Sequence, residues 1–386
     1  MTQSLLSLIL LEMGSATTTD EKCQKLLYLS MEKWHELMAL AERQGVLAIA
    51  VDGLQVLMEA HKDKIVAVRE NPAEWQLWLL ENIGQMTQYE IMNHQQKKVI
   101  AELSEIWAAE GIRMMVFKGQ ANAAFYPKPE HRAVGDIDCW LFGDAEKADN
   151  IMKNHGADVD CNWYRHSKIS FQGETIENHR VMSHTRGNKK HQKMERELRK
   201  MAKENLNDNV DLYLEGCGKA LKASAQFNAC FLTYHGLHHF TSEGLRLKQI
   251  LDWAMFLQKE QDKVDWNAYW DFCRRYKLDR FAEVMNYIAM QYLNVLCEQS
   301  EQVRADFNAN DNHNENDVRV FAEKVLQSTL YDDDFLFNSG KSDWMVRWLL
   351  VKNMFTNDRW KYRDIAQKNV WLQLWENVTG FLFDKN

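Results

Sequence analysis

The segment Arg132-Ala133-Val134-Gly135-Asp136-Ile137-Asp138 carries two aspartates two residues apart, within a largely apolar run that extends to residue 142. The run from 134 to 142 predicts a β-strand, and alternation along a strand places Asp136 and Asp138 on the same face. Two carboxylates this close repel each other unless a cation or a proton lies between them. Mg²⁺, or Mn²⁺ in its place, prefers such oxygen ligands and shares them with substrate phosphates. An exposed acidic strand end is the alternative interpretation of this pair alone.

A second motif lies upstream, where the apolar run from 112 to 117 predicts another strand, which ends at Lys118-Gly119. Glycine allows the backbone to come close to a ligand. Exposed N–H groups at such a turn, beside a lysine, suit a triphosphate. We therefore predict that Lys118, Gly119 and the following Gln120 bind a nucleotide.

A third carboxylate is predicted at Glu177, on the second of two strands, 168–171 and 175–181, which a tight turn near Gly173 joins. Three carboxylates can hold two metal ions, of which one activates the attacking oxygen and the other holds the leaving phosphates. Asp211 also lies between apolar residues and is the competing candidate for the third acid.

Two further side chains are candidate nucleotide ligands. Arg132 precedes the aspartate pair, where its fork of donors suits a triphosphate. The equally weighted alternative is that it pairs with Asp136 and only holds the loop in place. His179 follows the third acid by two residues, so it either orients Glu177 and contacts the substrate or is a histidine at the exposed end of a strand.

In their order, these motifs resemble the polymerase-β-type nucleotidyltransferase superfamily. The chain is more closely similar to an uncharacterised nucleotidyltransferase family common in gut Bacteroidetes. The resemblance rests on Phe117-Lys118-Gly119-Gln120-Ala121, Tyr126-Pro127-Lys128-Pro129, the segment from Arg132 to Asp138, and Ile176-Glu177-Asn178-His179. Parts of the segments 34–46, 227–253 and 357–362 resemble the family's helical regions before and after the core.

The resemblance implies a nucleoside triphosphate bound through Mg²⁺ by Asp136, Asp138 and Glu177, with Gly119 on the phosphate-binding turn. It implies an enzyme that transfers a nucleoside monophosphate to an acceptor hydroxyl and releases pyrophosphate. The acceptor, a small molecule, a protein or an RNA, is left open. Gln120 stands where other members of the superfamily have serine or glycine, and Asn178 stands where an apolar residue is usual. The departure at Gln120 motivates the alternative of a catalytically inactive nucleotide-binding or interaction protein with the same fold.

Outside these motifs the sequence is typical of helices, because only 3 prolines and 17 glycines interrupt 386 residues that are 46% hydrophobic. We predict an α+β fold, in which a small mixed-sheet nucleotidyltransferase core, 96–215, lies between helical regions 1–95 and 216–386. Asn71-Pro72 predicts the start of a long helix that Gly111 ends, with a break near Gly84.

The net charge of −8 provides no global basic field, which argues against DNA or an anionic membrane as a partner. The basic stretch 186–203 suits a polyanion such as RNA, but its mixed charges are more typical of a solvated helix face. The apolar start of the chain is too short to span a bilayer, and seven scattered cysteines without a CxxC pair predict a cytoplasmic protein with reduced thiols. His235, His238 and His239 are predicted to line the cleft or pack rather than to bind zinc.

Overall fold

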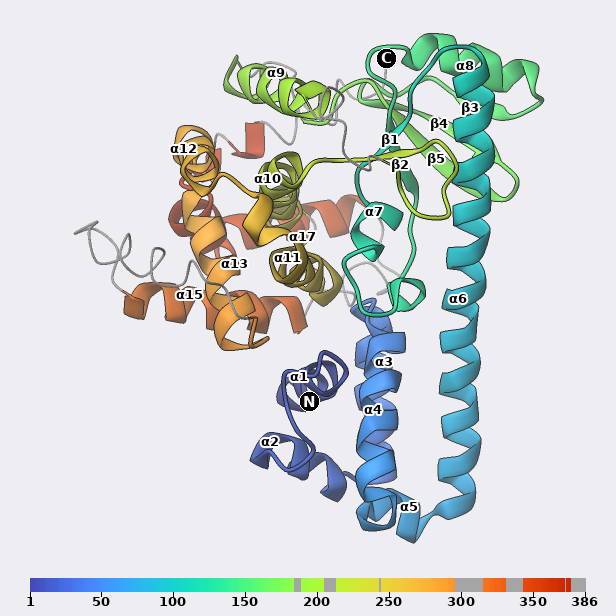
Figure 1. The fold of residues 1–386 in the computed structure, drawn as a ribbon. Helices are drawn as coiled ribbons and strands as arrows, with labels where there is room; N and C mark the ends of the chain where they lie inside the picture. Colours follow the sequence, from blue (N-terminus) through green and yellow to red (C-terminus); the bar gives the residue numbers. More distant parts are fainter. Residues whose placement is uncertain are drawn as a thin grey trace.

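The computed structural model describes residues 1–183, 189–204, 213–242, 244–295, 315–330, 343–371 and 373–375. Helices surround a six-stranded mixed sheet, which confirms the predicted helix-rich α+β fold. In Figure 1 the N-terminal helices lie at the bottom, the sheet at the upper right and the C-terminal helices at the left. Asp211 lies outside the described residues.

The N-terminal helices pack around a close contact between α1 and α4. Gly53 of α4 makes the contact possible, because a Cβ atom at this position would lie 2.0 Å from the carbonyl oxygen of Leu8 in α1. The elements of this region are α1 (Thr2–Glu12), α2 (Glu21–Gln24), η1 (Lys25–Tyr28), α3 (Met31–Arg43), α4 (Leu47–His61), η2 (Lys62–Lys64) and α5 (Val66–Glu70).

The helix α6 (Pro72–Ala109) is 38 residues long and connects the N-terminal helices to the sheet, as Figure 1 shows. Asn71 is its N-cap residue and Pro72 lies in its first turn, as predicted. The predicted break near Gly84 is wrong, because α6 is continuous through this residue. A Cβ atom at Gly84 would meet no atom within 4 Å, so no neighbour requires glycine there. The predicted boundary between residues 95 and 96 falls inside this helix.

The sheet has the strand order β3-β4-β5-β2-β1-β6, with β2 parallel to β5 and β1 parallel to β6. The other neighbours are antiparallel. Its strands are β1 (Met115–Val116), β2 (Ile137–Trp140), β3 (Asp158–Asp160), β4 (His166–Phe171), β5 (Glu174–His179) and β6 (Leu221–Lys222). Four of these strands match the predicted ones with shifted ends, whereas β3 and β6 were not predicted. The strand β6 lies beyond residue 215, so the sheet extends past the predicted end of the core.

The two faces of the sheet have different chemistry because side chains alternate along β2 and β5. Ile137, Cys139 and Ile176 belong to a buried apolar cluster that also contains residues of α6 and α8 (Ala145–Asn154). Asn178 lies on this face, where its side chain donates hydrogen bonds to the carbonyl oxygen of Ala145 and to Asp149. The buried partner on α8 explains the asparagine at a position where an apolar residue was expected.

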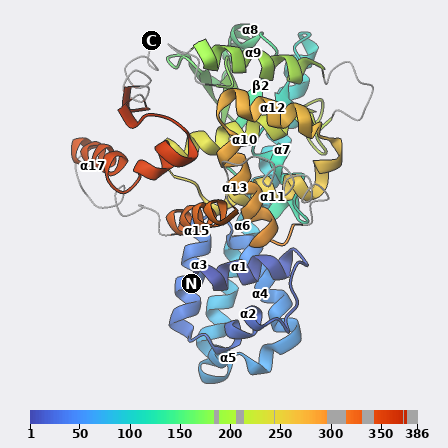
Figure 2. The same cartoon turned by 90° about the vertical axis from the view of Figure 1, so that its left-hand side faces the viewer.

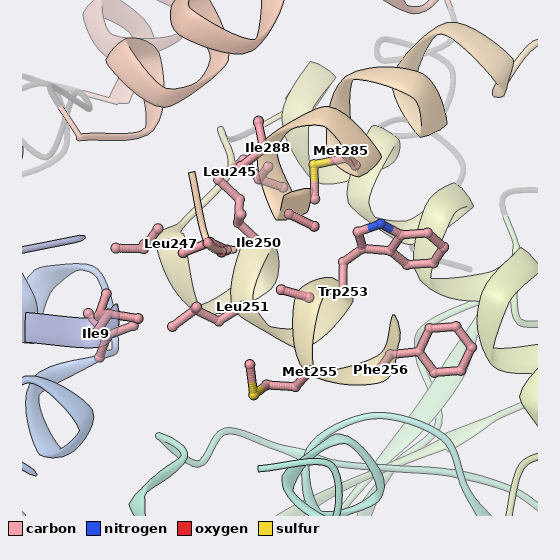
Figure 3. Close-up of a cluster of buried hydrophobic side chains, with 14 of the residues drawn as sticks. Ile9, Leu245, Leu247, Ile250, Leu251, Trp253, Met255, Phe256, Met285 and Ile288 are labelled. Atoms are coloured by element: carbon pink, nitrogen blue, oxygen red, sulfur yellow. The ribbon is translucent and has the colours of Figure 1, made fainter. Parts of the chain in front are cut away.

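The C-terminal helices pack around α11, which lies between α1 and α13. Figure 3 shows Ile9 of α1 near Leu251 of α11, while Met285 and Ile288 of α13 approach α11 from the opposite side. Figure 2 shows α15 above the N-terminal helices and α17 at the outer edge. The helices are α9 (Lys189–Glu204), α10 (Ala225–Ser242), α11 (Leu247–Glu260), α12 (Trp266–Tyr276), α13 (Asp279–Gln291), α15 (Glu315–Leu330) and α17 (Asp343–Phe355), with the short turns η4 (Gln261–Lys263) and η5 (Lys361–Ile365). No helix within the described ranges is both long and apolar enough to cross a membrane.

Candidate active site

A cavity of about 420 Å³ lies between the polar face of the sheet and the helices α10, α11 and α13. It brings together side chains from distant parts of the sequence. Its charged lining residues are Lys118, Arg132, Asp136, Asp138, Arg165, Glu177, Lys248 and Asp252. Most of the predicted site residues therefore share one wall, and the helical region after the core supplies the opposite wall.

The three predicted acids lie at this cavity. Asp138 of β2 and Glu177 of β5 are paired directly across the two parallel strands, and Asp136 precedes β2. Burial, followed by repulsion from Glu177 and Asp138, raises the pKa of Asp136. Three carboxylates thus contribute negative charge to one small region, as a cation site requires.

Lys118 and His179 balance the charge of the acids. The Nζ atom of Lys118 lies 2.5 Å from Oδ1 of Asp138, and Nε2 of His179 lies 2.9 Å from the same oxygen. Burial raises the pKa of Asp138, but the charge of Lys118 and the hydrogen bond from His179 outweigh burial and hold it well below its usual range. Burial alone would lower the pKa of His179, yet its hydrogen bonds with Asp138 and Glu177 raise it.

His166 of β4 was not predicted as a site residue, although it is paired with His179 across β4 and β5. Its Nε2 atom lies 3.4 Å from Oε1 of Glu177. Burial, the largest contribution, lowers the pKa of His166 to about 4, so the imidazole is neutral at pH 7. The sequence signal for this residue was its place in the hairpin, opposite the end of the Glu177 strand.

The turn after β1 depends on Gly119. Its φ of +53° lies in a region that L side chains rarely adopt, which explains the glycine at this position. The next residue, Gln120, begins α7 (Gln120–Ala123) and is buried. Its side chain donates hydrogen bonds to Asn93 and Gln96 of α6, so it points away from the cavity. Of the predicted turn, Lys118 and Gly119 line the cavity.

Arg132 forms a bidentate pair with Asp252 of α11, at 2.7 and 2.8 Å. Tyr126 and Asn122 donate hydrogen bonds to the same carboxylate. Burial raises the pKa of Asp252, but the charge and hydrogen bonds of Arg132 outweigh burial and lower it. The partner of Arg132 is thus Asp252, and the predicted alternative of pairing with Asp136 is not observed.

Two cationic lining residues, Lys248 and Arg165, were missed by the sequence analysis. Lys248 follows the N-terminus of α11, and Arg165 precedes β4. Burial and, after it, the positive charge of Arg132 lower the pKa of Lys248 to about 8. No local motif marks either residue, because their proximity to the acids arises only when the hairpin and α11 fold against β2.

The histidines of α10 also line the cavity, as predicted. The Nε2 atoms of His235 and His239 lie 2.9 Å apart, and His238 is a neighbour in the same wall. Burial lowers the pKa of His235 well below its usual value. Among the described residues, these histidines are not part of a group of three metal-binding side chains.

From residue 189 on, the basic stretch lies in the amphipathic helix α9, whose buried face carries Met194, Leu198 and Glu195; residues 186–188 lie outside the described residues. The carboxylate of Glu195 accepts hydrogen bonds from the backbone N–H groups of Met182 and Ser183, and it also pairs with Arg199. One face of the helix is therefore part of the core, and its lysines lie on the remaining faces.

Comparison with known proteins identifies a family for this chain. A family model described as uncharacterised nucleotidyltransferase matches residues 30–294, a range that includes the three acids and α11. No curated protein and no solved structure matches the chain. Because the matched range covers more than half of the 386 residues, the chain belongs to this family of uncharacterised nucleotidyltransferases.

Proposed function

We propose that the protein transfers a nucleoside monophosphate from a nucleoside triphosphate to an acceptor hydroxyl and releases pyrophosphate, with Mg²⁺ at Asp136, Asp138 and Glu177. The fold would then be a distant relative of polymerase-β-type nucleotidyltransferases. The observation that carries the proposal is the convergence of three carboxylates on a cavity whose walls also hold Lys118, Arg165 and other cations.

The donor chemistry of the acids fits the metal. Carboxylate oxygens are the ligands that Mg²⁺ prefers. The pKa of Asp136 is raised mainly by burial and then by the charges of Glu177 and Asp138, and a divalent cation would offset this mutual repulsion. In the absence of metal, Lys118 and His179 balance this charge at Asp138. When bound, Mg²⁺ neutralises phosphate charge and favours in-line displacement.

The remaining residues of the cavity would hold the substrate. The turn at Gly119 brings the backbone close to Asp136, where its N–H groups suit phosphate oxygens. Lys118 and Arg165 carry positive charge on the same side as the acids, and Lys248 does so on α11. Arg132 contributes through Asp252, because the pair fixes α11 and with it the position of Lys248.

The test measures the melting temperature with ATP, GTP, CTP or UTP, with and without Mg²⁺, together with pyrophosphate release. We expect one nucleotide to raise the melting temperature by roughly 2–4 °C at saturating concentration, because it binds only the folded state. Asp138→Asn should abolish the magnesium-dependent shift and slow pyrophosphate release by about 100-fold or more. Asp158→Asn is the matched control, since Asp158 is exposed on β3 of the same sheet.

Two results would contradict the proposal. Pyrophosphate release that survives in both Asp136→Asn and Asp138→Asn would remove the acids from the mechanism. A magnesium-dependent nucleotide shift without release of pyrophosphate, over a range of small-molecule, protein and RNA acceptors, would instead support the inactive nucleotide-binding protein with the same fold.

A further inference from the structure

His166 is buried, with 5% of the residue's surface exposed, and neither of its ring nitrogens has a hydrogen-bond partner. Buried polar atoms in proteins are nearly always hydrogen-bonded, because leaving one without a partner costs free energy. His166 lies at the polar face of the sheet, next to Glu177 and His179. Its two unpartnered nitrogens therefore need an explanation.

The three neighbouring side chains have the arrangement of a metal site. The ligand atoms of His166, Glu177 and His179 all lie within 4.8 Å of one another. The Nε2 atom of His166 is 3.4 Å from one oxygen of Glu177, and Nε2 of His179 is 3.4 Å from the other. Bonds of about 2.1 Å at the tetrahedral angle separate neighbouring ligand atoms by about 3.4 Å.

The backbone already orients His179 for such a role. Its Nδ1 atom lies 3.2 Å from the carbonyl oxygen of Val181, and since a carbonyl only accepts, Nδ1 carries the donated hydrogen. Metal-binding histidines commonly use one ring nitrogen in this way and bind the metal with the other. The other nitrogen, Nε2, is the one that faces Glu177 and Asp138.

We propose that His166, Glu177 and His179 bind a transition-metal dication of the zinc type, at a site next to the magnesium site of Asp136 and Asp138. Two imidazoles and one carboxylate are a frequent donor set for zinc, whereas Mg²⁺ favours oxygen ligands throughout. Glu177 and His179 line the cavity, which gives the ion a route from solvent. On binding, the proton on Nε2 of His179 passes to solvent and a nitrogen–metal bond forms in its place.

The zinc site goes beyond the proposed function and shares Glu177 with its magnesium site, while His179, which pairs with Asp138 in the absence of metal, becomes a zinc ligand. A carboxylate has two oxygens, so it can contact two ions at once, as in sites where metals lie about 3.5–4 Å apart. The ion would join β4 to β5 at the wall of the cavity and fix the carboxylate of Glu177.

Calorimetric titration with Zn²⁺ alone, without nucleotide, tests the site. We expect one zinc ion per chain, and millimolar Mg²⁺ should not displace it. His166→Gln should weaken zinc binding by about 100-fold or more, since it removes one ligand. The matched control is His155→Gln, because His155 is an exposed histidine at the C-terminal end of the neighbouring α8. Visible absorption of bound Co²⁺ in place of zinc should also be lost in His166→Gln.

Absence of zinc uptake by the unmodified protein would overturn the inference, and so would equal zinc affinity in His166→Gln and His155→Gln. If His166→Gln does not fold, as judged by its melting curve, Glu177→Gln takes its place with the same expected loss. Asp138→Asn leaves all three zinc ligands in place, so loss of pyrophosphate release in that variant with zinc binding retained separates the two proposals.

Discussion

At the scale of single residues, the charge at Asp138 is balanced by two groups from other parts of the sheet. Lys118 follows β1, Asp138 lies on β2 and His179 ends β5. If a divalent ion binds Asp138 as proposed, Lys118 would lose this partner and could pair with a substrate phosphate instead.

Lys248 gives a prediction for the pH dependence of nucleotide binding. With a pKa of about 8, set mainly by burial and then by Arg132, it is charged at pH 7 and becomes neutral as the pH rises through 8. We expect nucleotide affinity to fall several-fold between pH 7 and pH 9, as titration calorimetry would measure. Lys248→Arg should remove this fall, because arginine keeps its charge over that range.

As the pH rises, the effect of Lys248 on folding stability is opposite in sign to its effect on nucleotide affinity. Its folded-state pKa is lower than the 10.5 of the unfolded chain, so the unfolded state binds more protons between pH 8 and pH 10.5, and stability rises with pH there. Affinity and stability thus change in opposite directions above pH 8. If affinity also rose with pH, Lys248 would not contact the nucleotide.

At this scale the sequence predicts contacts between residues that are close in the chain and misses contacts between distant ones. Asp136 immediately precedes β2 and Asp138 lies on it, so a separation of two residues in extended chain is enough to bring them together. Asp252 lies 120 residues from Arg132, and no local pattern connects them. His166 was overlooked for a related reason, since its place opposite His179 depends on the register of the β4–β5 hairpin.

At the scale of elements, two helical glycines have opposite consequences. Gly53 lies where α4 touches α1, and an added methyl group would overlap the backbone of Leu8. Gly84 lies in α6 with open space around it. The same substitution at the two positions therefore tests the close contact against helix propensity.

We expect Gly53→Ala to lower the free energy of unfolding by about 1–3 kcal/mol, because α1 must move away from α4. Gly84→Ala should raise it by roughly 0.5–1 kcal/mol, because alanine favours the helix. Urea denaturation of both variants measures the two effects. A neutral result at Gly53 would mean that α1 and α4 separate without cost.

Elements with a clear period or cap were predicted well, and the shortest strands were not. The Asn71-Pro72 cap and the β4–β5 hairpin both carry their own local signals. The strand β6 has only two residues, and its partner β1 lies more than a hundred positions earlier in the chain. No local sequence pattern therefore predicts this pairing. The glycine in α6 was read as a break, although a single glycine in a long helix costs less than the contacts on either side of it provide.

At the scale of the whole molecule, the buried pair of Arg132 and Asp252 joins the sheet region to the C-terminal helices. The pair lies beside the cavity, and Tyr126 and Asn122 complete its hydrogen bonds. A buried ion pair that loses one member leaves the other charge without compensation, and that costs about 3–5 kcal/mol. This buried pair is therefore one of the contacts that hold the two walls of the cavity together.

Asp252→Asn should destabilise the protein by about 3–5 kcal/mol, because the charge of Arg132 then remains buried alone. The double variant Arg132→Met/Asp252→Asn should lose less than the sum of the two single variants, since no unpaired charge remains. Chemical denaturation of the four proteins in this cycle measures the coupling. If the effects of the two single variants on the free energy of unfolding simply add in the double variant, Arg132 and Asp252 do not stabilise each other.

The unbroken helix α6 has a consequence for any attempt to divide the protein. At 1.5 Å per residue its 38 residues extend for about 57 Å. In its first half Trp75 and Trp78 pack against Trp34 of α3, while its second half packs against the sheet. A truncated version that begins at residue 96 would start in mid-helix and expose Val99 and its neighbours at a frayed end. Protease digestion should accordingly spare this junction, and a shortened protein that retains the sheet should begin no later than the cap at Asn71.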